Sequence, residues 1–69
     1  MGKYRIKSST LALLEDNGRR VSCTLPAGTV IATDYLEAQG MVEVVWENKK
    51  FLMFAKDLRS RAEPLETPV

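Results

Sequence analysis

The turn signals most constrain what this chain can fold into, because they leave room only for short extended segments. Asn17-Gly18 readily adopts the positive φ of a hairpin turn, and Pro26 presets a second turn in which Gly28 takes the last position. The segments between these turns are rich in β-branched residues or alternate between polar and apolar side chains. Five or six such strands separated by turns predict an all-β fold, a small barrel.

The chain length predicts a single domain. Its 69 residues lie near the lower limit for a chain that folds around one hydrophobic core. We assign that domain to residues 1–63 and expect residues 64–69, which include two prolines, to form a flexible tail. Cys23 is the single cysteine and there is no histidine, so we expect no internal disulfide, no metal and no cofactor. Oligomerisation is then the remaining means of stabilising so small a domain.

The N-terminal segment and the charge balance bear on where the protein acts. MGKYRIKSST contains no apolar signal core, and no apolar run approaches the roughly 18 residues that cross a membrane. We therefore expect a cytoplasmic protein without membrane contact. Ten basic and nine acidic side chains nearly cancel, which argues against strong non-specific nucleic-acid binding through net charge.

The stretch GMVEVVWENKKFLMFAKDL, residues 40–58, predicts a β-hairpin that is apolar on both sides. A two-residue loop at Asn48-Lys49 would place Trp46 opposite Phe51 on one side, as expected of a wall of the core. The other side should be polar if it faces water. It instead carries Met41, Val45, Leu52 and Phe54.

We predict that this second side of the hairpin is a protein interface covered by another subunit. Burying these apolar side chains would stabilise a small domain that has neither disulfide nor metal. Two intramolecular explanations compete with the interface. A sharp bend could carry the halves of the hairpin into different sheets, or residues 34–40 could fold back so that Tyr35 and Leu36 cover the surface.

Two segments resemble the bacterial SH3-like domains, which are small five-stranded barrels. LPAGTVI, residues 25–31, is similar to their L-x-x-G-t-x-V turn and strand, and residues 40–58 are similar to their g-W-x-k-V-x-y-n-g-k-x-G-y-V-x-x-x-y-L ending. AKDL, residues 55–58, stands in the place of their 3₁₀ turn, and residues 59–63 would follow as the last short strand. The resemblance extends from about Tyr4 to about Arg61 and implies an SH3-like barrel.

Five of the ten basic side chains would gather in such a barrel, because its first and last strands are neighbours. They are Lys3, Arg5 and Lys7 on the first strand, and Arg59 and Arg61 on the last. This basic patch is a candidate contact for an anion or for nucleic-acid phosphates. Alternating charges also serve as solvated surface and edge protection, and we favour that interpretation.

No residue pattern indicates catalysis. Without histidine, acid–base or nucleophilic chemistry would depend on carboxylates, lysines, a tyrosine or Cys23, and Cys23 falls between apolar neighbours as a buried structural cysteine would. Tyr35 and Trp46 are candidate ligand contacts. Trp46 is more simply explained as a core or interface anchor, and Tyr35 could equally fold its ring over one end of the barrel.

Together these patterns predict a non-enzymatic interaction module. The expected partner is a second copy of the chain or another protein, so that the module forms a homo-oligomer or part of a complex. Two alternatives stay open: a nucleic-acid-binding small barrel that uses the basic patch, and an enzyme whose active site forms only at an interface between subunits.

Overall fold

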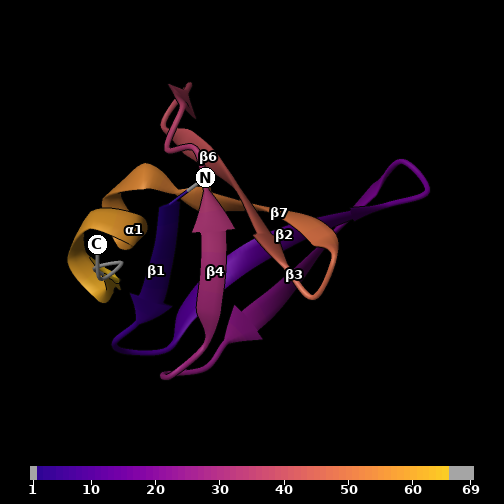
Figure 1. Cartoon of the computed structure of the whole chain (residues 1–69). Coiled ribbons are helices and arrows are strands. Elements are labelled where there is room, and N and C mark those ends of the chain that lie inside the picture. Colours follow the sequence, from indigo (N-terminus) through magenta and orange to yellow (C-terminus); the bar gives the residue numbers. More distant parts are fainter. Residues whose placement is uncertain (1, 66–69) are drawn as a thin grey trace.

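One antiparallel sheet of eight strands and one short helix make up the fold (Figure 1). The computed structural model describes residues 2–65. In chain order the elements are β1 (Gly2–Ile6), β2 (Thr10–Asp16), β3 (Arg19–Leu25), β4 (Val30–Thr33), β5 (Glu37–Ala38), β6 (Met41–Trp46), β7 (Lys49–Phe54), α1 (Ala55–Arg61) and β8 (Ala62–Pro64). The expectation of an all-β fold is confirmed.

The strand order describes an open sheet and not a barrel. The strands follow one another as β3-β2-β7-β6-β4-β1-β8, and β5 pairs with β6 on the edge that β4 also uses. Within residues 2–65, β3 and β8 stand at opposite ends of this order and do not pair with each other. The expected barrel of five or six strands was therefore wrong in strand number and in closure.

Two features of the chain keep the ends of the sheet apart. The hairpin of β2 and β3 meets β7 at Leu13–Leu52 and Leu14–Phe51, and its tip extends away from the other strands (Figure 1). The molecule accordingly measures 39 × 22 × 21 Å. At the other end, α1 takes the chain up to Arg61, and β8 then pairs with β1 alone among the described residues. The sheet therefore stays open at this end.

Three hairpins close through two-residue turns in which both residues have positive φ. They are Asn17-Gly18 between β2 and β3, Gln39-Gly40 between β5 and β6, and Glu47-Asn48 between β6 and β7. Positive φ at both positions gives the turn a twist that matches the paired strands. The turn at Asn17-Gly18 is confirmed, and the turn expected at Asn48-Lys49 was wrong by one residue.

The displaced turn changes the register of the β6–β7 hairpin but not its faces. Trp46 lies opposite Lys49 and Val44 lies opposite Phe51, so each β6 residue faces a β7 residue two positions earlier than expected. Side chains alternate along a strand with a period of two, so a shift of two positions leaves each of them on its expected side.

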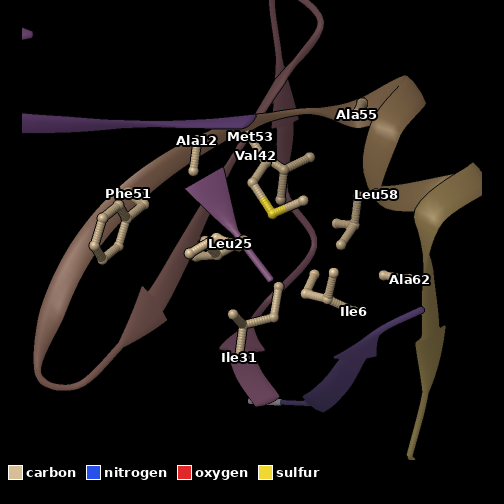
Figure 2. Close-up of a cluster of buried hydrophobic side chains, with 11 residues drawn as sticks. Ile6, Ala12, Leu25, Ile31, Val42, Phe51, Met53, Ala55, Leu58 and Ala62 are labelled. Carbon is tan, nitrogen blue, oxygen red and sulfur yellow. The ribbon is translucent and has the colours of Figure 1, made fainter. Parts of the chain in front are cut away.

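Buried side chains from both ends of the sheet meet in one core (Figure 2). Its members are Ile6, Ala12, Leu25, Ile31, Val42, Val44, Phe51, Met53, Ala55, Leu58 and Ala62. Ile6 of β1 and Leu25 of β3 share this cluster although their strands lie far apart in the strand order, which means that the sheet curls around its inner face. Fully burying a side chain of this size stabilises the fold by roughly 1.5–3 kcal/mol.

Helix α1 packs against the core through one face. Ala55 and Leu58 are buried on it, and Ala62 continues the same face into β8. Such spacing places the three side chains on one side of a helix. The 3₁₀ turn expected at residues 55–58 was wrong, because an α-helix continues to Arg61. The last short strand, expected at residues 59–63, is present but begins only at Ala62.

Backbone hydrogen bonds hold both ends of α1. The Ala55 N–H donates to the carbonyl oxygen of Gly40 at 2.9 Å, and the Lys7 N–H donates to that of Arg61 at 2.7 Å. These bonds satisfy helix-terminal groups that have no partner within the helix itself. They also tie the helix to the β5–β6 turn and to the end of β1.

The C-terminal edge strand extends beyond residue 63, where the domain was expected to end. β8 ends at Pro64, and the Leu65 N–H donates to the carbonyl oxygen of Lys3 at 2.8 Å. The rest of the expected tail, residues 66–69, lies outside the described residues.

Candidate functional site

The outer face of β2, β7 and β6 carries an apolar surface that we call the outer patch. Its apolar side chains, which point away from the core, are Leu11, Leu13, Met41, Val45, Leu52 and Phe54. The charged Glu43 and Lys50 lie on the same face and are counted with it. Leu52 pairs with Leu13 on β2, and Phe54 pairs with Met41 on β6. Extending the β2–β7 register places Leu11 beside Phe54, so the apolar side chains form rows across the strands.

The outer patch contains all of the residues that the sequence predicts as a protein interface. Met41, Val45 and Leu52 are half-buried, and Phe54 is 46% exposed. Leu11 and Leu13 were missed, although the apolar run of residues 11–14 contained the signal: alternate residues of an extended strand point to opposite faces, so such a run makes both faces apolar. The use of the patch as an interface stays a prediction.

A pocket of about 300 Å³ lies between part of the outer patch and residues 34–38. Its lining is apolar at Leu36, Ala38, Met41, Val45 and Leu52, with Asp34 and Glu43 at the same site. Leu36 is 76% exposed, so it stands at this pocket without covering it.

The alternative in which Tyr35 covers the outer patch is not what the structure shows. Its ring packs against Tyr4 with centroids 5.8 Å apart and contacts the core, so it lies away from the outer patch. The positive φ of 55° at Tyr35 redirects the chain at this point. The interpretation of Tyr35 as a ring folded over one end of the core is therefore the one that its position supports.

Thr33, the last residue of β4, hydrogen-bonds to the part of β6 that lies between its pairings with β4 and with β5. The two strands meet β6 at Val45 and at Val42, respectively. Between these points the buried Thr33 Oγ1 donates to the carbonyl oxygen of Glu43 at 2.7 Å and accepts from the Tyr35 N–H at 3.0 Å. One hydroxyl thereby supplies hydrogen bonds where the strand ladder is interrupted, and it fixes the loop beside the outer patch.

Charged side chains in the outer patch pair with each other. Lys50 Nζ lies 3.7 Å from Glu43 Oε1, and both side chains are mostly exposed. An exposed pair of this kind contributes only about 0–1 kcal/mol to stability. The outer patch is therefore dominated by its apolar surface.

The basic patch is more dispersed than expected. β1 and β8 are neighbours, as predicted, but Arg59 and Arg61 lie on α1 and not on the last strand. Three of its arginines lie close to carboxylates: Arg5–Glu63 at 3.7 Å, Arg59–Glu37 at 3.2 Å and Arg61–Asp57 at 3.8 Å. These neighbours partly neutralise the field that would attract phosphates, which favours the solvated-surface interpretation.

Trp46 and Cys23 both contact the core from its margin. The Trp46 ring is half-buried, with its centroid 5.8 Å from that of Phe51, which fits an anchor better than a ligand platform. Cys23 is a free, half-buried thiol on the inner face of β3. Burial on this face decreases toward the hairpin tip, from the fully buried Leu25 to Val21, which is 50% exposed.

A larger pocket of about 660 Å³ opens where β2 and β7 diverge. Acidic side chains of β2, Glu15 and Asp16, line one part of it, and Lys49 and Lys50 of β7 line another. No sequence pattern indicated this pocket, because it arises between two hairpins that are distant along the chain.

The described part of the chain holds no cluster of three or more His, Cys, Asp or Glu side chains that could bind a metal ion. Among residues 2–65 there is also no helix of the length and apolar character needed to cross a membrane. Comparison with known proteins found no matching family model, no matching curated protein and no matching solved structure.

Proposed function

We propose that this chain is a non-enzymatic interaction module that binds another protein subunit through the outer patch. One observation carries the proposal: three adjacent strands are apolar on both faces, and within residues 2–65 the chain buries only the inner one. Phe54 and Leu11, side by side in one row of the outer face, are each 46% exposed. Contiguous apolar surface of this kind marks interaction sites on soluble proteins.

Burial of the outer patch would supply free energy for association. Fully burying an apolar side chain of this size contributes roughly 1.5–3 kcal/mol. A side chain that is already half-buried in the single chain would therefore gain about half as much when a partner covers it. Several such contributions together can exceed the costs of association and ordering, which are estimated at about 4–15 kcal/mol. An exposed aromatic residue such as Phe54 is also typical of an interface anchor.

The apolar character of the patch supports binding over catalysis. Its charged members, Glu43 and Lys50, pair with each other at 3.7 Å. The nucleic-acid alternative has less support, because three arginines of the basic patch already have carboxylate neighbours. The alternative of an active site at a subunit interface has no such observation in its support.

The double variant Val45→Lys, Leu52→Glu tests the proposal. Both side chains lie on the outer patch and neither belongs to the core, so the variant should fold. If a second copy covers the patch, wild type should sediment as a larger assembly than the double variant, which should stay folded. Circular dichroism should show the same β-dominated spectrum for both.

The matched control introduces the same two charges elsewhere, with Val30→Lys and Ala27→Glu at exposed positions outside the patch. This control should sediment as wild type does. A wild type that is monomeric at about 100 μM, far above the range of stable assemblies, would contradict coverage by a second copy. A double variant that keeps the wild-type assembly would contradict the role of the outer patch.

A further inference from the structure

The two ends of the sheet differ in how well their edges are protected. β8 has three residues and ends at Pro64, which lacks a backbone N–H. β3 has seven residues, and in the part of the chain that is described only β2 pairs with it. A long free edge offers a row of backbone donors and acceptors to another strand.

The middle of β3 lacks the usual features that protect an edge. Residues 21–24 carry no charge and no proline, and β3 pairs with β2 in an unbroken register without a bulge. Arg19 and Arg20 lie at one end of the strand, next to the turn. Val21 is 50% exposed although it points to the inner face, because the core does not extend this far along the hairpin.

We propose that β3 pairs antiparallel with β3 of a second copy of this chain, about a two-fold axis at Ser22. Ser22 is the middle residue of Arg19–Leu25, so this register pairs the strand over its whole length of seven residues. In it, Val21 of one copy lies beside Cys23 of the other, and both side chains point to the inner face. Registers displaced by one position would join the inner face of one copy to the outer face of the other.

The charges of β3 favour the same register. It places Arg20 of one copy opposite Thr24 of the other and Arg19 opposite Leu25, so no two arginines face each other across the interface. Moving the axis toward the turn loses pairs at the far end of the strand and brings the arginines of the two copies together. Like charges directly opposite one another destabilise a strand pair.

Pairing through β3 also covers exposed apolar surface. Val21 pairs with Leu14 on its own β2, and the second copy adds Cys23 on the other side. The half-exposed valine is then enclosed between two apolar neighbours. In the resulting two-copy sheet the remaining edges are the two β8 strands, which are short and end in proline.

Cysteine cross-linking tests the register directly. In a Cys23→Ser background, Ser22→Cys places two thiols directly opposite each other across the axis, at a separation that a disulfide spans. Mild oxidation should convert most of this variant to a covalent dimer. The matched control, Thr24→Cys in the same background, should remain uncrosslinked, because four positions along a strand separate its two thiols by about 13 Å. Equal cross-linking of both variants, or none of Ser22→Cys, would overturn the proposal.

Val21→Lys distinguishes the β3 edge from the outer patch. The side chain is exposed in a single copy, so the variant should fold, but a dimer would have to bury its charge. Sedimentation should show at least about tenfold weaker dimerisation for Val21→Lys. Val30→Lys, at a comparable exposure of 44%, should dimerise as wild type does.

If Val45→Lys, Leu52→Glu dissociates the dimer and Val21→Lys does not, the two copies meet through the outer patch and the β3 pairing is wrong. A wild-type monomer at about 100 μM would also overturn it.

Discussion

The inner and outer faces of β2, β7 and β6 are built from similar apolar residues but have different environments. Met53 on the inner face is fully buried, whereas Phe54, the next residue, is 46% exposed on the outer face. The difference arises from what lies above each face. Ile6 of β1 and Leu58 of α1 reach over the inner face, as Figure 2 shows, and they share its core cluster. Apolar composition therefore indicates that a face can be buried, and the tertiary structure decides whether it is.

The largest expected difference in stability between the two faces lies at two adjacent residues of β7. Met53→Ala should lower the free energy of unfolding by about 2–5 kcal/mol, because it leaves a cavity in the core. Leu52→Ala, on the outer patch, should cost less than half as much when the chain is monomeric, because the half-buried side chain leaves no enclosed cavity. Urea unfolding at about 1 μM protein, where association is weakest, measures both. Equal losses would show that the outer face is covered within a single chain.

Two buried threonines test how much side-chain hydrogen bonds contribute to stability. Thr33→Val removes a hydroxyl that donates to Glu43 and accepts from Tyr35, so it should cost about 1–3 kcal/mol through the unsatisfied groups it leaves. Thr10 is the matched control: its buried Oγ1 has no hydrogen-bond partner among the described residues, so Thr10→Val should be neutral or stabilising. A loss of stability from Thr10→Val as large as that from Thr33→Val would contradict the hydrogen-bond assignment.

The β6–β7 turn allows a test of how the register of the two faces is held. Glu47 and Asn48 have φ of 51° and 63°, whereas the β2–β3 turn uses Asn17-Gly18 for the same geometry. Changing Glu47→Asn and Asn48→Gly should stabilise the protein by about 0.5–1 kcal/mol, because the new pair tolerates positive φ better. Thermal unfolding would report it as a small rise in Tm. Glu47→Ala is the control and should give no gain; a destabilised double variant would mean that the turn lies elsewhere.

The smallest effect is expected from the charged pair in the outer patch. Lys50→Gln removes the partner of Glu43 and should change the free energy of unfolding by less than about 0.5 kcal/mol, because both side chains are solvated. Its effect should vanish in about 0.5 M salt, where screening is strong. A loss above about 1 kcal/mol that persists at high salt would show that the outer face is far less accessible to water than the 46% exposure of Phe54 indicates.

The sequence contains part of the signal for helix α1, although the pattern predicted a different structure there. Ala55, Leu58 and Ala62 follow the spacing of a helical face, yet the short segment was interpreted as a 3₁₀ turn followed by a strand. Its α-helical form depends on contacts outside the segment, because a helix of seven residues is too short to be stable alone. Its two ends are held by backbone bonds from Ala55 to Gly40 and from Lys7 to Arg61.

The sequence alone determined the β-class, the Asn17-Gly18 turn and the division of the 40–58 hairpin into two apolar faces. The faces survived a register error because strand alternation has a period of two, and the error was also two positions. Tertiary structure decided the register, the open sheet and the covering of one face. These features depend on contacts between distant segments, such as Ile6 with Leu58 in the core and Thr33 with Glu43 at the edge of β6. Local patterns do not contain such contacts, because curling of the sheet brings the segments together only when the whole chain folds.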